Sequence, residues 1–213
     1  MHTETSALFH ITLLRHGESV GNAKGYHQGQ ADFPLTEQGR AQAQALASYW
    51  QTRGVIFDQI IASPQSRARE TCEIIAKALG VEVEFDPLWM ERDNGLLAGL
   101  LHEEARLKYP QPDFIPLYEP IGQTGESQWE LFLRGGRAVQ SILHRPPGRY
   151  LIVSHGGLLN MVMHAILGLT PQANFQGPRF LFRNTAYASL IYKPSSHNWL
   201  VIGVNQCHHW NET

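Results

Sequence analysis

Several features common in other protein classes are absent or scarce in this sequence. Its only two cysteines, Cys72 and Cys207, do not form a Cys-x-x-Cys pair, which excludes a disulfide framework. The formal net charge of −2 provides no basic field that would attract nucleic acid or an anionic membrane. No apolar run approaches the roughly 18 residues of a membrane span, and Met1–Ser6 is polar rather than signal-like. The sequence therefore predicts a cytoplasmic protein without nucleic-acid or membrane partners.

Three catalytic signatures are missing as well. No Gly-x-Ser-x-Gly occurs, which excludes the nucleophile elbow of serine hydrolases, and no Walker A sequence occurs, which excludes P-loop nucleotide hydrolysis. His102-Glu103-Glu104 lacks a second histidine at helical spacing, and no cysteine pair completes a zinc site. These absences argue against a zinc site, a serine-hydrolase mechanism and P-loop nucleotide hydrolysis.

The chain does contain the composition and the pattern of a globular domain. Its 213 residues, 43% of them hydrophobic and 17% charged, suit one domain over residues 1–213. Short apolar runs alternate with segments of helical spacing, and the last two runs pair as an antiparallel hairpin. This order predicts an α/β fold, a three-layer α/β/α sandwich with a mostly parallel central sheet and an antiparallel edge. The expected strands are 8–14, 58–62, 81–85, 150–154, 186–192 and 199–205, and the expected helices are 37–50, 64–79, 103–109, 126–144 and 158–167.

Two segments depart from this alternation. Residues 20–35 are rich in Gly, Asn, Gln and Asp and are expected to form a loop. Residues 87–125 carry prolines at 110, 112, 116 and 120, which exclude long regular elements. A long segment of this kind suits a lid or substrate-specificity insertion.

Polar and glycine residues follow three of the expected strands, at the point where each strand ends. Arg15-His16-Gly17 follows the first strand, Ser63–Arg67 the second, and Ser154–Gly157 the strand that we expect at the centre. Because the carboxyl ends of parallel strands meet at one edge of a sheet, these residues should converge. Two arginines, two histidines, glycine amides and helix N-termini all favour an anion, and phosphate in particular. An imidazole in such a site can act as a nucleophile or a base.

Longer motifs surround these junctions and follow one another over residues 10–160. They are Leu14–Asn22, Leu35–Gly39 with Gln42-Ala43, Ala62–Thr71, Met90-Glu91-Arg92 with Gly95 and Gly99, Thr124–Ser127, and Val153–Gly157. In these motifs and their order the chain resembles the histidine phosphatase superfamily, also called the phosphoglycerate mutase-like family, and its phosphatase branch in particular.

The resemblance implies a metal-independent phosphomonoester phosphatase of the histidine acid phosphatase type that acts on a small phosphorylated metabolite. It also implies that the protein binds no metal ion and no cofactor. His16 would attack phosphorus and form a phosphohistidine, which requires an unprotonated ring nitrogen. Glu91 would protonate the leaving oxygen and then activate water. The residues expected to hold the phosphoryl oxygens are Arg15, Arg67 and His155. The residues expected to bind phosphate or substrate are Asn22, Gln28, Gly29, Arg92 and Gly156.

Several of these assignments have competitors. Arg69 lies in the same expected helix as Arg67, and the spacing from Ser63-Pro64 favours Arg67. Three other acidic residues compete with Glu91, whose Met-Glu-Arg context favours it: Glu103, Glu104 and Glu126. The remaining histidines are expected to be packed or exposed rather than to bind a ligand: His27, His102, His164, His208 and His209.

Two other functions stay open, a 2,3-bisphosphoglycerate-dependent phosphoglycerate mutase and a non-catalytic phospho-ligand binder. A mutase of this superfamily usually has added basic residues in its insertion, whereas residues 100–125 offer only Arg106 and Lys108. Arg92 could serve a carboxylate or second phosphate. A non-catalytic binder would be expected to lack His16 or Glu91. The aromatic and aliphatic residues expected to suit a partly apolar leaving group, and so to favour a phosphatase, are Phe114, Ile115, Leu117 and Tyr118.

The oligomeric state is open too. The aromatic-rich strand at 199–204 and the tail through Trp210 suit either a core position or an exposed edge that pairs two copies in a homodimer.

Overall fold

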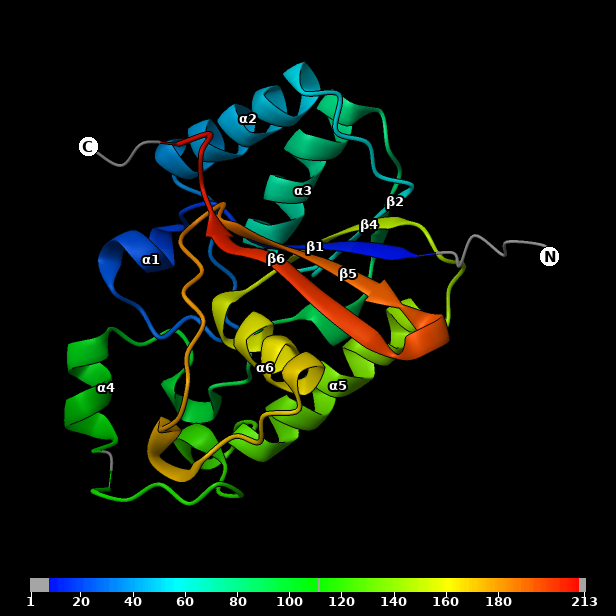
Figure 1. Ribbon diagram of the computed structural model, residues 1–213. Coiled ribbons are helices and arrows are strands. Elements are labelled where there is room, and N and C mark those ends of the chain that lie inside the picture. Colours follow the sequence, from blue (N-terminus) through cyan, green and yellow to red (C-terminus); the bar gives the residue numbers. More distant parts are fainter. Residues whose placement is uncertain (1–7, 111, 211–213) are drawn as a thin grey trace.

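The computed structural model describes residues 8–110 and 112–210 and has a six-stranded sheet in the order β3-β2-β4-β1-β5-β6 (Figure 1). The pairs β3–β2, β2–β4 and β4–β1 are parallel, and the pairs β1–β5 and β5–β6 are antiparallel. The predicted mostly parallel sheet with an antiparallel edge is therefore confirmed. The strands are β1 (Phe9–Arg15), β2 (Gln59–Ala62), β3 (Val83–Phe85), β4 (Arg149–Ser154), β5 (Tyr187–Lys193) and β6 (Asn198–Gln206).

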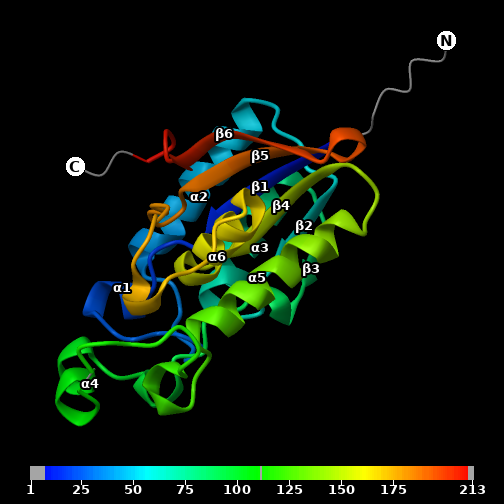
Figure 2. The same cartoon turned by 60° about the horizontal axis from the view of Figure 1, so that its bottom comes forward.

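Helices cover both faces of the sheet, as expected for a three-layer sandwich (Figures 1 and 2). One face packs against α2 and α3, and the other against α5 and α6. Successive residues of β1 divide between the two cores: Leu13 belongs to the core under α5 and α6, and Leu14 to the core under α2 and α3. The helices are α1 (Val20–Lys24), α2 (Glu37–Thr52), α3 (Ser66–Leu79), α4 (His102–Lys108), α5 (Gln128–Leu143) and α6 (Gly156–Leu167).

Local signals in the sequence set most helix boundaries. The Thr36 side chain caps α2 by accepting the N–H of Gly39, and Ser127 caps α5 in a capping box with Glu130. Gly80 ends α3 in the left-handed conformation, with φ of 70°. One expectation was wrong: the predicted loop at 20–35 contains the short helix α1, because Ser19 and Asn22 form a capping box at its start. The helix predicted from Pro64 begins two residues later, at Ser66.

The segment around α4 lies at one end of the molecule, beyond the sheet (Figures 1 and 2). Among the described residues between 87 and 125, regular structure is limited to α4 and three short 3₁₀ turns, as the prolines predict. The two edge strands of the sheet are β3 and β6, and β6 exposes Leu200, Val201 and Ile202.

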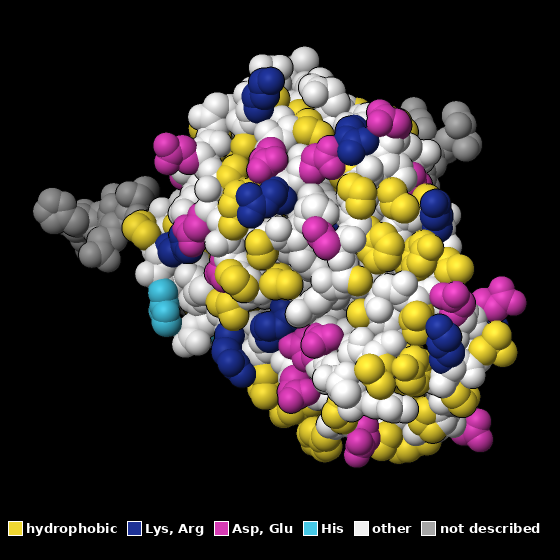
Figure 3. Space-filling view, turned by 180° about the vertical axis from the view of Figure 1, so that it is seen from behind, with side chains coloured by type: hydrophobic (Ala, Val, Ile, Leu, Met, Phe, Trp, Pro, Cys, Tyr) yellow, Lys and Arg dark blue, Asp and Glu magenta, His cyan; other side chains and the backbone are white. Residues whose placement is uncertain are grey.

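The surface has no broad field of one charge sign on the face shown in Figure 3, where acidic and basic side chains of the described residues alternate with apolar ones. Across the same described ranges, no helix is both long and apolar enough to cross a membrane. The expectation for Met1–Ser6 lies outside the described residues.

Candidate active site

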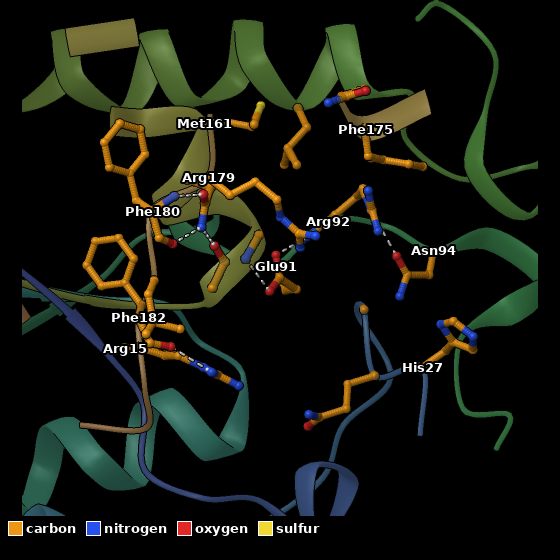
Figure 4. Close-up of a pocket in the computed structure, with 18 of the residues that line it drawn as sticks. Arg15, His27, Glu91, Arg92, Asn94, Met161, Phe175, Arg179, Phe180 and Phe182 are labelled. Carbon is orange, nitrogen blue, oxygen red and sulfur yellow. Dashed lines mark hydrogen bonds between the residues drawn. The ribbon is translucent and has the colours of Figure 1, made fainter. Parts of the chain in front are cut away.

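A cavity with a volume of about 740 Å³ opens at the carboxyl ends of β1 and β4 (Figure 4). Arg15 and His16 reach it from the end of β1, Arg67 from the first turn of α3, and Gly156 from the first turn of α6. The junctions singled out in the sequence therefore converge, because the strands that precede them are parallel neighbours.

His16 is buried at this edge, with 2% of its surface exposed. Its Nδ1 lies 2.6 Å from the carbonyl oxygen of Gly17. Because a carbonyl only accepts hydrogen bonds, Nδ1 carries the proton and Nε2 keeps its lone pair. Burial, followed by the charges of Arg67 and Arg15, holds the pKa of His16 well below its ordinary value. The ring is thus a neutral imidazole with one nucleophilic nitrogen.

Close packing fixes the loop that follows His16. The Gly17 N–H donates to the Thr71 hydroxyl at 3.0 Å, and a Cβ on Gly17 would lie 2.5 Å from the Gly39 carbonyl oxygen. A Cβ on Gly39 would in turn clash with the backbone oxygen of Glu18. The motif Leu35–Gly39 therefore supports the loop: its glycine lets the start of α2 approach the backbone next to His16.

Arg15 and Arg67 flank this histidine. Arg15 donates to the Phe182 carbonyl at 2.8 Å, and Arg67, only 1% exposed, donates to the Gly29 carbonyl at 2.8 Å. Their Nε atoms are buried and have no hydrogen-bond partner among the described residues. Burial lowers the pKa of Arg67 to about 10. Guanidinium groups held in this way have donors left for an anion.

Arg69, the competitor of Arg67, points elsewhere. Its guanidinium carbon lies 4.0 Å from the centre of the Phe85 ring, and its side chain is exposed.

His155 lies directly behind His16, with 5.1 Å between the ring centroids. It is fully buried at the N-cap position of α6, where its side chain makes no capping hydrogen bond, and it does not line the cavity itself. The expectation that His155 holds a phosphoryl oxygen therefore stays a prediction. Its Nε2 lies 2.8 Å from the Ser63 hydroxyl, and its buried Nδ1 has no partner among the described residues. Burial, then the Arg67 charge, holds the pKa of His155 well below its ordinary value.

Glu91 sits at the N-terminus of α6. Its carboxylate accepts the backbone N–H groups of Gly157 and Leu158, both at 3.0 Å, and that of Arg92 at 2.9 Å. This position places the carboxylate at the positive end of the helix dipole. A Cβ on Gly157 would lie 2.5 Å from the Glu91 Oε1 atom, so the glycine is what allows the close approach.

The acidic competitors of Glu91 do not share this position. Glu103 and Glu104 lie in the exposed first turn of α4, and Glu126 is paired with Arg134 at 2.7 Å. Glu91 is the single acidic residue among the described residues that line the cavity.

Four of the five residues expected to bind phosphate or substrate line the cavity: Gln28, Gly29, Arg92 and Gly156. Asn22 does not, because its side chain accepts the Ser19 N–H at 3.1 Å in the capping box of α1. In the described ranges no three His, Cys, Asp or Glu side chains are grouped so that they could hold a metal ion.

The prediction that residues of the 100–125 segment face the leaving group was wrong. Phe114 and Tyr118 are exposed, and neither they nor Ile115 and Leu117 line the cavity. Arg106 and Lys108 are exposed on α4 and do not line it either. The apolar wall instead comes from α5, α6 and the segment before β5: Leu131, Met161, Phe175, Phe180, Leu181 and Phe182.

Sequence reasoning also missed polar residues of the cavity. Arg179 and Asn160 line it. The cavity is also lined by His27, His102 and His164, and the expectation that these histidines bind no ligand stays a prediction. One signal could have revealed Arg179. It lies shortly before β5, an antiparallel neighbour of β1, and such a strand starts at the edge where β1 ends.

The chain is similar to curated proteins named "Probable phosphoglycerate mutase GpmB". The protein from Cronobacter sakazakii is 36% identical over 207 residues, which cover 92% of this chain and 90% of that protein. The protein from Yersinia enterocolitica is 34% identical with the same coverage.

Two solved structures share the fold. YhfR from Bacillus stearothermophilus has a TM-score of 0.80 and 29% identity, over 94% of this chain and 98% of that chain. A mycobacterial glucosyl-3-phosphoglycerate phosphatase with bound VO₃ has a TM-score of 0.76 and 25% identity, over 92% of this chain and 98% of that chain. The family model of the histidine phosphatase superfamily (branch 1) matches residues 11–205. The chain therefore belongs to the histidine phosphatase superfamily, as its motifs predicted.

Proposed function

We propose that this protein is a phosphomonoester phosphatase that needs no metal ion and acts on a small phosphorylated metabolite through a phosphohistidine on His16. The observation that carries the proposal is the state of His16. Its Nδ1 is fixed on the Gly17 carbonyl, so a neutral Nε2 is left for attack within a cavity that also contains Arg15 and Arg67.

The reaction would proceed in two displacements. In the first, His16 Nε2 forms a bond to phosphorus, the ester oxygen–phosphorus bond breaks, and Glu91 gives its proton to the leaving oxygen. In the second, Glu91 takes a proton from water as the water oxygen attacks phosphorus, and the bond to His16 breaks to release phosphate.

The phosphoryl oxygens need donors that are already in position. Arg15 and Arg67 offer their unpartnered Nε groups, and their terminal nitrogens are held in place by backbone carbonyls. His155 would contribute through Nδ1: if Ser63 donates to Nε2, the proton of this neutral ring lies on Nδ1. Positively charged groups fixed around the transferred group are what phosphoryl transfer requires.

The test is hydrolysis of p-nitrophenyl phosphate by the purified protein, with and without EDTA, and by His16→Ala. We expect the wild type to hydrolyse the ester equally in both conditions, and His16→Ala to lose all turnover while its circular dichroism spectrum is unchanged. Substantial turnover by folded His16→Ala would show that His16 is not the nucleophile. If EDTA abolished hydrolysis and an added metal ion restored it, the metal-free mechanism would be refuted.

The second candidate is a phosphoglycerate mutase, which the names of relatives at 34–36% identity favour. Incubation with 3-phosphoglycerate, with and without 2,3-bisphosphoglycerate, separates the two functions. A phosphatase releases phosphate, and a mutase yields the 2-phospho isomer only with the bisphosphate. The apolar wall and the volume of about 740 Å³ leave room for a leaving group larger than a three-carbon acid, which supports the phosphatase.

A further inference from the structure

We propose that Gln65 is a positioning residue for the proton donor: its side-chain amide holds the backbone of Glu91 and ties it to the loop that holds Arg67. This inference rests on the proposed function, because Gln65 acts on the reaction through Glu91. Gln65 does not line the cavity, so it can influence the chemistry only through the residues that it binds.

Gln65 stands at the N-cap position of α3, but its side chain does not cap the helix. The side chains that cap well are those of Ser, Thr, Asp and Asn, and the Gln65 side chain makes no capping hydrogen bond. It is buried, and a buried amide is unfavourable unless its two ends find hydrogen-bond partners. The partners of the amide therefore show what this side chain does.

The two ends of the amide bind two different segments of the chain. The Oε1 atom of Gln65 accepts the backbone N–H of Glu91 at 2.8 Å, and its Nε2 atom donates to the Gly29 carbonyl at 3.0 Å. Because an N–H only donates and a carbonyl only accepts, these partners fix the orientation of the amide. A neutral amide makes both hydrogen bonds at once, which neither an aliphatic side chain nor a carboxylate can do.

Among the described residues, Gln65 is the one partner of the Glu91 N–H. The carbonyls of this segment are held separately by the Arg134 guanidinium, which donates to Leu88, Met90 and Glu91 at 3.0, 2.6 and 3.2 Å. Removal of the Gln65 amide should therefore release the backbone N–H of Glu91 without unfolding the segment around it.

The Glu91 backbone in turn determines where the carboxylate lies. The carboxylate accepts the N–H groups of Gly157 and Leu158, both at 3.0 Å. A shift of the Glu91 backbone would weaken these hydrogen bonds and move the carboxylate away from the leaving oxygen. A misplacement of about 1 Å can cost about 100-fold in rate.

Gly29 connects the proton donor to the phosphoryl site. Its carbonyl accepts the Gln65 amide at 3.0 Å and a terminal nitrogen of Arg67 at 2.8 Å. Through this shared oxygen, the amide fixes Glu91 relative to an arginine that is expected to hold the phosphoryl oxygens. General acid catalysis depends on that relative position, since the donor must lie within hydrogen-bond reach of the leaving oxygen.

The test measures kcat and KM for an alkyl phosphate and for p-nitrophenyl phosphate in Gln65→Met and Gln42→Met. Methionine has nearly the length of glutamine but no amide. Gln42 is the matched control, because it is also buried and its Oε1 atom accepts the N–H of Glu18, on the loop after His16, at 2.9 Å.

We expect the fall in kcat of Gln65→Met to be about tenfold or more larger for the alkyl ester, because nitrophenolate leaves without a proton donor. KM should stay at the wild-type value, since Gln65 does not line the cavity. Gln42→Met should lower kcat for both esters equally, because His16 acts on both. In a Glu91→Gln background, Gln65→Met should lower kcat for the alkyl ester no further, whereas losses that multiply would show that Gln65 acts through another group.

A second measurement follows the position of Glu91 without turnover. In ¹⁵N-labelled protein, the amide protons of Gly157 and Leu158 report the hydrogen bonds to the Glu91 carboxylate. We expect Gln65→Met to move both resonances upfield, because these hydrogen bonds weaken, and Gln42→Met to leave both in place. If Gln65→Met does not fold, Gln65→Asn replaces it, because asparagine keeps an amide but is one carbon too short to reach both partners.

The outcomes separate this inference from the proposed function. Equal falls in kcat for the two esters in Gln65→Met, or unchanged resonances of Gly157 and Leu158, overturn the role of Gln65. Shifted resonances together with no hydrolysis of either ester by the wild type support the positioning of Glu91 by Gln65 and contradict the phosphatase assignment.

Discussion

Replacement of Gly157 by alanine should separate catalysis from stability. The new Cβ would lie 2.5 Å from the Glu91 Oε1 atom, closer than such atoms approach in proteins, so the carboxylate must move. It would then lose the N–H donors of Gly157 and Leu158, both at 3.0 Å, and leave the position of the proposed proton donor. A misplacement of about 1 Å can cost about 100-fold in rate. We expect kcat for an alkyl phosphate to fall by about that factor.

Stability should change much less. Loss of a carboxylate at a helix N-terminus costs about 0.3–1 kcal/mol, and glycine to alanine at a compatible backbone position gains about 0.4–1 kcal/mol. Gly157 has no left-handed backbone angle, so alanine fits its conformation. The free energy of unfolding should therefore stay within about 1 kcal/mol of the wild-type value.

The assay compares kcat for an alkyl phosphate and for p-nitrophenyl phosphate in Gly157→Ala, Glu91→Gln and Gly136→Ala. The first two should lose far more on the alkyl ester, because nitrophenolate leaves without a proton donor. Gly136→Ala is the matched control: it lies inside α5, nothing lies within 4 Å of its added Cβ, and it should keep full activity. Gly157→Ala with wild-type kcat on the alkyl ester would refute this account of Glu91.

The remaining predictions concern pH and the support of the His16 loop. The pKa values of buried His16 and His155 lie well below about 6.5, so below that pH these histidines bind protons in the unfolded chain but not in the folded protein. The free energy of unfolding should therefore fall as pH drops below about 6.5. Each such histidine contributes up to about 1.4 kcal/mol per pH unit, so in urea unfolding His155→Gln should show a shallower pH dependence; an unchanged slope would contradict this. Thr71→Val removes the acceptor of the Gly17 N–H at 3.0 Å and should cost about 1–3 kcal/mol. Thr71→Val should also lower kcat, whereas Thr71→Ser should keep the wild-type stability and the wild-type kcat. Equal stability and equal kcat in the two variants would rule out the role of the hydroxyl.

The centre of the site could be predicted from the sequence because it depends on local rules. His16 and His155 directly follow apolar strand patterns, and parallel strands bring such junctions to one edge. Arg67 follows from the same reasoning, since the helix after Ser63-Pro64 starts at that edge. None of these placements needs knowledge of how distant side chains pack.

The walls of the cavity could not be predicted, because they depend on long-range packing. Phe114 and Tyr118 suggested an apolar specificity segment, but both side chains are exposed and neither lines the cavity. The segment with Phe175, Arg179 and Phe180 has no regular periodicity, and only the pairing of the following strand, β5, with β1 indicates that the segment borders the site. The Asn22 side chain forms the capping box of α1 with Ser19 instead of lining the cavity. The sequence motif did not reveal this local hydrogen bonding.

The central claim is that His16 carries the phosphoryl group during turnover. The most direct measurement is a rapid denaturing quench of the protein with ³²P-labelled substrate, followed by peptide mapping of the label. Our account predicts an acid-labile, alkali-stable label on the peptide containing His16, at a yield that rises in Glu91→Gln with a good leaving group because hydrolysis of the intermediate is slowed. A label on another residue, or steady turnover with no labelled protein at any quench time, would contradict it.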